Sequence, residues 1–235
     1  MLGWKESFNV KSRAYFSMQH IQSAALFARH SGQIEKEYDG NFSSELITEY
    51  WAYVTASIFT AVSFLEATIN EFFADTTEEY SENLRALDSN TKALMADKWK
   101  SMSKDYSIRM MDKFDIALMV AGKPTFNRGE KPAQYVDLIV ELRNSLIHYY
   151  PEWVNDGITA SSMVATKRKS LKGLIGKFPT SPLMNKSGPF FPNKCLGYGC
   201  ARWSVKSSLA YSDEFYARLG VSAPYEHIRQ YLRTI

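Results

Sequence analysis

Apolar residues recur at intervals of three and four along most of the chain, which is the spacing of one face of an α-helix. Asp39-Gly40, Gly122 and Gly220 interrupt this pattern where helices are expected to end. The pattern predicts helices at 13–38, from Ser43 or Ser44 to 74, and at 91–100, 108–121, 132–149, 200–219 and 225–233. We therefore expect an all-α fold, organised as a helical bundle.

The segment 51–65 carries no charge over 15 residues and is the most apolar part of the chain. Large apolar side chains mark one face of its helix, namely Trp51, Val54, Ile58, Val62, Leu65, Ile69 and Phe72. A helix that is apolar over most of its surface belongs in the middle of a bundle. Because a membrane span needs about 20 apolar residues, we expect a buried helix and no membrane anchor.

The composition fits one folded domain that covers residues 1–235. Of the 235 residues, 45% are hydrophobic and 14% are aromatic, which is enough for one sizeable core. The formal net charge of +3 is too small to indicate nucleic-acid binding by itself. The first residues, MLGWKESFNVK, contain no apolar run like that of a signal peptide, so we expect a cytoplasmic protein.

The two cysteines, Cys195 and Cys200, predict neither a metal site nor a disulfide framework. A single C-x4-C pair without a second pair is not a zinc pattern. No group of His, Asp and Glu has metal-ligand spacing, and the sequence contains no P-loop, GxGxxG or HExxH motif. We expect no metal and no cofactor.

The stretch VELRNSLIHYYPEW, at 140–153, combines three polar side chains near the end of a predicted helix. Pro151 disfavours helix at the residue before it, so Arg143, Asn144 and His148 fall in the last turns. Five residues correspond to about 140° of rotation and roughly 7.5 Å of rise, so Arg143 and His148 can share one rim. A fixed cation, an amide and an imidazole suit phosphodiester cleavage. The alternative is that they cap the helix C-terminus, where cations are favoured.

An Arg and a His at similar spacing also occur at Arg13 and His20. This pair is followed by Ala14 in place of a polar residue, and it lies near the start of a helix. We treat it as a coincidental match.

Glu66 stands out in the apolar central helix because no basic residue lies three or four positions away. It is either a hydrogen-bonded residue at the helix edge or a residue that orients Arg143 or His148. Burial without such a partner would be costly.

The most basic cluster follows Pro151 and comprises Lys167, Arg168, Lys169, Lys172 and Lys177. Such a charge run is either a solvated face or, if the protein handles RNA, a set of phosphate contacts.

The Arg-Asn-x-x-x-His sequence of Arg143, Asn144 and His148, at the end of a helix in an all-helical chain, resembles the HEPN (higher eukaryotes and prokaryotes nucleotide-binding) domain family. The stretch SFLEATINEFF, at 63–73, is similar to the central helix of uncharacterised bacterial members. The resemblance covers a core at about 13–153, with a helical extension at about 154–235. It implies a HEPN-type bundle with additional C-terminal helices.

The resemblance also implies a function and partners. Many HEPN proteins are metal-independent endoribonucleases that act as dimers, often as toxins paired with an antitoxin protein or in phage defence. We therefore expect RNA as substrate, and a homodimer through the motif helix, the helix that carries Arg143 and Asn144. Tyr149, Tyr150 and Trp153 are large, rigid and amphipathic, so they are either contacts at the two-fold axis or ordinary core aromatics. The alternatives are a catalytically inactive relative that binds RNA, a nucleotide or a protein, and a purely structural helical protein.

Overall fold

The computed structural model describes residues 13–41, 43–78, 84–151, 169–183 and 189–235 of the protein. Within these ranges all regular secondary structure is helical and no strand occurs, so the all-α prediction is confirmed. Residues 1–12 lie outside the described residues, as do Lys167 and Arg168.

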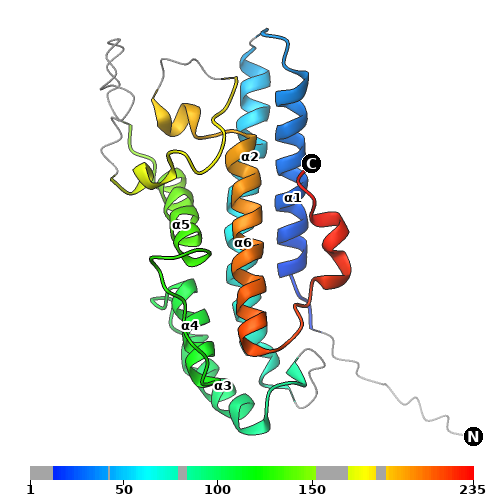
Figure 1. The fold of residues 1–235 in the computed structure, drawn as a ribbon, viewed down its shortest axis with the longest axis vertical. Helices are drawn as coiled ribbons and strands as arrows, with labels where there is room; N and C mark the ends of the chain where they lie inside the picture. The colour runs from blue at the N-terminus through cyan, green and yellow to red at the C-terminus, as the bar shows by residue number, and fades with distance from the viewer. Residues whose placement is uncertain (1–12, 42, 79–83, 152–168, 184–188) are drawn as a thin grey trace, which may run out of the picture.

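The predicted helices are present in the predicted order, with ends that differ by a few residues. The helices are α1 (Ser17–Glu37), α2 (Ser44–Asp75), α3 (Ser89–Met102), α4 (Met110–Val120), α5 (Ala133–Ile147) and α6 (Tyr198–Leu219), together with the shorter η3 (Lys169–Leu174), η4 (Phe190–Lys194) and η5 (Glu226–Leu232) (Figure 1). The two short helices η3 and η4 were not predicted. Two local predictions are confirmed. The Ser43 hydroxyl accepts a hydrogen bond from Leu46 N at 3.1 Å, and Gly220 ends α6 with a φ of 72°.

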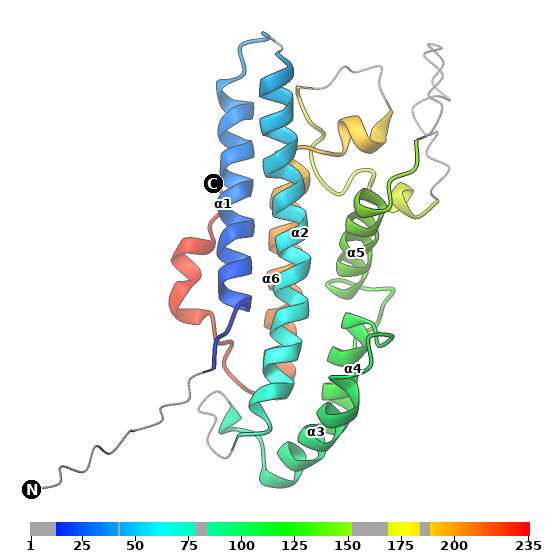
Figure 2. The ribbon, with the colours of Figure 1, turned by 180° about the vertical axis from the view of Figure 1, so that it is seen from behind.

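The long helices α1, α2 and α6 pack beside one another, and α3, α4 and α5 follow one another in a column next to them (Figures 1 and 2). Helix α2 contacts each of α1, α3, α4, α5 and α6, because it is apolar on most of its sides. Its predicted place in the middle of the bundle is confirmed.

Length and composition alone would allow α2 to cross a bilayer. In its most apolar window 50% is buried inside the protein, and the core helix of a soluble protein passes the same test of length and composition. The feature is therefore weak evidence for a membrane span.

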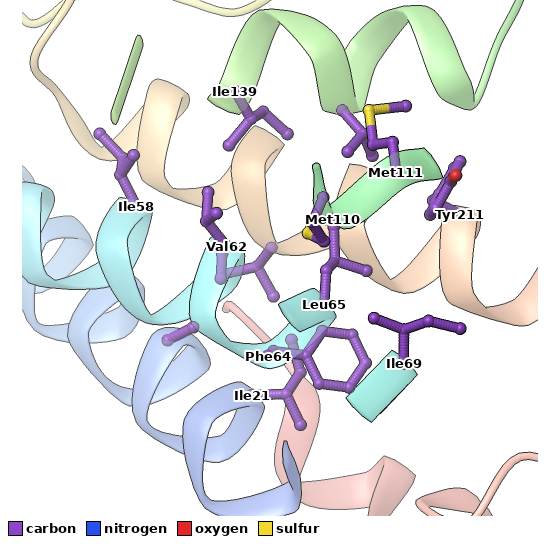
Figure 3. Packing of buried hydrophobic residues seen from close by; sticks show 14 of the residues in the cluster. Ile21, Ile58, Val62, Phe64, Leu65, Ile69, Met110, Met111, Ile139 and Tyr211 are labelled. Carbon is purple, nitrogen blue, oxygen red and sulfur yellow. The ribbon is translucent and has the colours of Figure 1, made fainter. Parts of the chain in front are cut away.

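Helix α6 contributes to the hydrophobic core, although it lies in the segment at about 154–235 that the resemblance gives as a C-terminal extension. Its side chains Cys200, Ala201, Val205, Tyr211 and Phe215 are buried in the same cluster as α1 and α2. In Figure 3, Tyr211 of α6 lies near Met111 of α4, and both belong to the cluster that contains Ile21, Leu65 and Ile139. Chain order does not reveal this arrangement, because α6 packs on helices more than a hundred residues earlier.

The N-terminus of α6 is held in this core by a carboxylate from α1. Glu35 Oε1 accepts hydrogen bonds from Tyr198 N, at 2.8 Å, and from the Tyr50 hydroxyl. The same hydroxyl lies 2.9 Å from Ser181 Oγ. Burial raises the pKa of Glu35. One acidic side chain thus joins α1, α2 and α6.

Two apolar side chains near the ends of outer helices are exposed, although their spacing matches the apolar faces of those helices. Met119 near the end of α4 is 58% exposed, and Ile147 at the end of α5 is 53% exposed. Both helices lie on the outside of the bundle, so one side of each faces solvent.

Candidate functional site

The motif helix α5 ends one residue before His148. Pro132 stands at its N-cap, and His148 is its C-cap, where the backbone leaves the helical region and His148 N donates to Asn144 O at 2.9 Å. Arg143 and Asn144 therefore lie in the last turns as predicted, while His148 lies just beyond them.

A cavity of about 990 Å³ opens between α2, α3, α4 and α5. Glu66 lines it from α2, and Arg143 and Asn144 line it from α5. His148 is exposed and is not among the lining residues. Three of the four predicted catalytic residues thus share one cavity, and the fourth lies outside it at the end of the motif helix.

Arg143 is half-buried in the cavity wall, and its guanidinium has no hydrogen-bonded or ionic partner among the described residues. Its Nε is buried and makes no hydrogen bond, and no ion pair joins its guanidinium to a carboxylate of the described residues. Buried charges are normally paired, so this guanidinium is suited to an anionic ligand. Arg202 on α6 also has a buried Nε without a hydrogen bond, but it does not line the cavity.

Glu66 takes its partner from α4. Lys113 Nζ lies 2.5 Å from Glu66 Oε1 and 3.0 Å from Asn70 Oδ1, and Lys113 is only 9% exposed. The hydrogen-bonded alternative for Glu66 is therefore observed, and an orienting role toward Arg143 or His148 stays a prediction. Lys113 was not predicted as a site residue, although its place inside the apolar helix MMDKFDIALMV was a usable signal.

Like Lys113, Arg128 in the cavity wall forms ion pairs with carboxylates. Its guanidinium lies 3.0 Å from Asp112, 2.8 Å from Asp115 and 3.4 Å from Asp137. Burial raises the pKa of Asp137, and the neighbouring carboxylates add to this effect while Arg128 opposes it. This network joins α4 to the first half of α5 and thereby helps to position the motif helix.

The predicted phosphate-binding cluster is only partly described. Lys167 and Arg168 lie outside the described residues, and for Lys169 the structure describes only the backbone, in η3. Lys172 is exposed in η3, which packs against α5, but it does not line the cavity. The role predicted for these residues stays a prediction.

The alternative Arg–His match differs from the motif in its contacts. Arg13 lies 3.5 Å from Asp75 and 2.5 Å from Glu78, so its charge is already balanced. His20 packs edge-on against Phe16, and burial lowers its pKa. These contacts favour the interpretation of this pair as a coincidental match.

The residues predicted to form a dimer contact lie at the end of the motif helix. Tyr149 and Tyr150 are exposed, and the Tyr149 ring lies 6.2 Å from the ring of Phe191. Trp153 lies outside the described residues.

Cys195 and Cys200 are free thiols in the core, where burial raises the pKa of Cys200. In the part of the chain that the structure describes, no group of three or more His, Cys, Asp and Glu side chains is arranged to hold a metal ion.

Comparisons with models of protein families, with curated proteins and with solved structures find no match to this chain. The resemblance to HEPN domains therefore rests on the residues quoted above.

Proposed function

We propose that this protein is a metal-independent endoribonuclease in which Arg143 binds the scissile phosphate and His148 transfers protons. The observation that carries the proposal is the half-buried Arg143 guanidinium, which lines a cavity and has no carboxylate partner among the described residues. Lys113 and Arg128 line the same cavity, but each is paired with a carboxylate. Arg143 is thus a cation that remains available for an anion.

In the proposed chemistry the 2′-hydroxyl of the substrate loses its proton and attacks the adjacent phosphorus, the P–O5′ bond breaks, and the departing 5′-oxygen receives a proton. An imidazole can remove or donate a proton near neutral pH. A guanidinium can hold a phosphate through two parallel hydrogen bonds and balance the negative charge that develops on phosphorus. Asn144, beside Arg143 in the cavity wall, would position the substrate.

The reaction needs one proton removed and another donated, and one His148 cannot do both at once. A two-fold dimer with both motif helices at its axis would bring two copies of His148 together, because an isologous interface places each residue near its own copy. The location of His148 at the exposed end of α5, outside the cavity, is compatible with such an interface.

A binding module without catalysis is the second candidate. It is favoured by the separation of His148 from the cavity that Arg143 and Asn144 line. In that case the cavity would bind RNA, a nucleotide or a protein segment, and no bond would be cleaved.

Incubation of the purified protein with mixed RNA in EDTA distinguishes the two candidates. We expect cleavage by the parent protein and none by His148→Ala, Arg143→Ala or Arg143→Lys, since lysine is only a point charge. His227→Ala removes an exposed imidazole away from the cavity, and Arg202→Ala removes a guanidinium whose Nε is similarly buried. Both controls should cleave at the parent rate.

Two results would overturn the nuclease proposal. One is cleavage at the parent rate by both His148→Ala and Arg143→Ala. The other is tight RNA binding by the parent protein without cleavage in EDTA or with Mg²⁺, which would favour the binding module.

A further inference from the structure

The α3–α4 loop presents an aromatic ring at the edge of the cavity. Tyr106 lines the cavity and is 98% exposed. The loop around it is ordered by Asp105, whose Oδ1 accepts hydrogen bonds from Ser107 N at 2.9 Å and from Ser107 Oγ at 2.6 Å. A large ring held almost wholly in solvent, beside a cavity, is suited to stacking on a planar ligand.

A second available cation lies three residues further on. Arg109 lines the cavity, is exposed, and forms no ion pair with any described residue. Of the four cations in the cavity wall, Lys113 and Arg128 are paired, so Arg109 and Arg143 can each contact an anion. One belongs to the start of α4 and the other to the end of α5.

The charge of the cavity limits what these cations can bind. Five carboxylates also line it, from Glu66, Asp105, Asp112, Asp137 and Glu141. Because these five negative charges outnumber the four positive ones, the cavity cannot act as a continuous track for a polyanionic backbone. A neutral base inside the cavity, with its neighbouring phosphates at Arg109 and Arg143, avoids repulsion between the phosphates and these carboxylates.

The size of the cavity agrees with such a guest. Its volume of about 990 Å³ is at the upper end of the range of roughly 300–1,000 Å³ for small-molecule sites. Its wall also contains apolar side chains, including Met102, Ile108 and Val140, beside the polar groups. Apolar walls and an aromatic edge suit the face of a nucleobase, and carboxylates can accept from its N–H groups.

We propose that the cavity is a base pocket for single-stranded RNA, in which one unpaired base stacks on Tyr106 while the neighbouring phosphates contact Arg109 and Arg143. This inference rests on the proposed function, because it takes the phosphate at Arg143 to be the one that is cleaved. It identifies the substrate as single-stranded, since a base within a duplex cannot enter the cavity without leaving its stack.

The test measures binding without cleavage. The probe is a fluorescein-labelled 2′-O-methyl oligoadenylate, whose blocked 2′-hydroxyl prevents reaction, and binding is followed by fluorescence anisotropy. Base–aromatic stacking is worth about 1–3 kcal/mol, so Tyr106→Ala should weaken binding about five-fold or more. Tyr106→Phe keeps the stacking ring and should retain the parent affinity.

Further variants separate stacking from charge. Lys104→Ala removes an exposed cation of the same loop that does not line the cavity, and it should bind like the parent. An abasic strand of equal length should bind weakly and should be insensitive to Tyr106→Ala. Arg109→Ala should weaken both strands and reduce the slope of log affinity against log salt by roughly one.

Several results would overturn the base pocket. These are no measurable binding of the oligoadenylate, equal binding by Tyr106→Ala and the parent, an equal loss for the intact and abasic strands, and displacement of the probe by free AMP at concentrations equal to those of the oligonucleotide. The cleavage assay is independent of this result. Loss of cleavage in His148→Ala, together with unchanged binding by Tyr106→Ala, would support the nuclease proposal and contradict the base pocket. Weakened binding by Tyr106→Ala, together with no cleavage by the parent protein, would support the base pocket and contradict the nuclease proposal.

Discussion

Lys113 Nζ lies 2.5 Å from Glu66 Oε1, so the carboxylate of the central helix is balanced from α4 and not from the motif helix. Lys113 is nearly buried, whereas the Glu66 side chain is 41% exposed. A buried ammonium that loses its carboxylate keeps, among the residues that the structure describes, only Asn70 as a hydrogen-bond partner. The pair therefore links α2 to α4 at the wall of the cavity.

We expect Glu66→Ala to lower the free energy of unfolding by about 1–2 kcal/mol, because it leaves the Lys113 charge without its anion. Lys113→Met should lower the free energy of unfolding by less than Glu66→Ala does, since the exposed Glu66 carboxylate can be solvated. Urea denaturation of both single variants and the double variant should give a coupling energy of about 1 kcal/mol. Additive effects, together with loss of RNA cleavage in Glu66→Ala alone, would assign Glu66 to the orientation of Arg143 or His148.

The products of cleavage should end in a 2′,3′-cyclic phosphate, because the proposed nucleophile is the 2′-hydroxyl of the RNA itself. Cleavage should continue after metal is removed with EDTA, and a strand with a single 2′-deoxy substitution should be spared at that position. Mass spectrometry of the products tests all three points. Cleavage that stops in EDTA and returns with Mg²⁺ would indicate a metal-dependent nuclease.

The shared-site mechanism predicts that pairing with an inactive subunit abolishes cleavage by an active one. The parent is co-refolded with increasing amounts of the His148→Ala protein. Cleavage per parent subunit should fall toward zero, because each mixed dimer has only one His148 imidazole at the shared site. Co-refolding with His227→Ala should leave it unchanged. Sedimentation should find about twice 26.8 kDa. A monomer that cleaves RNA at full rate at every concentration would contradict this mechanism.

Glu35 predicts a pH-dependent contribution to stability. Burial raises its pKa above the ordinary value of 4.5, so the folded protein binds more protons than the unfolded chain between the two pKa values. The free energy of unfolding should therefore decrease as pH rises through this interval. In Glu35→Gln this contribution is absent, and the remaining carbonyl can still accept from Tyr198 N and Tyr50.

Thermal denaturation of the parent and Glu35→Gln from pH 4 to 8 isolates this contribution as a difference curve. Glu35→Ala loses both hydrogen bonds and should be destabilised by about 1–3 kcal/mol at every pH. Parallel curves for the parent and Glu35→Gln would show that Glu35 has the same pKa in both states.

Any side chain at Gly199, at the start of α6, should destabilise the folded protein. A Cβ atom there would lie 2.2 Å from the carbonyl oxygen of Pro179, so the backbone would have to move. Gly199→Ala should lower the free energy of unfolding by about 1–3 kcal/mol. Gly129→Ala, where the nearest atom is the Asn127 side-chain oxygen at 3.3 Å, should change it by about 0.5 kcal/mol or less. Equal stability of the two variants would contradict the tight docking of α6.

The sequence by itself determined helices α1 to α6 and η5, with ends correct to within a few residues, but not the short η3 and η4. The central position of α2 followed from apolar residues on most of its sides, and the Ser43 cap, the Pro132 start of α5 and the Gly220 stop followed from local chemistry. These features depend on helical periodicity and on backbone groups a few residues apart. The placement of Arg143 and Asn144 near the end of a helix was predictable for the same reason.

Only the tertiary structure decided which distant residues meet. It placed α6 in the core, made Lys113 the partner of Glu66, and put Tyr106 and Arg109 around the cavity that Arg143 lines. Helical periodicity shows that a face will be buried but not which helix will cover it. That choice depends on how all the faces pack together, because each contact must compete with every alternative arrangement of the same helices.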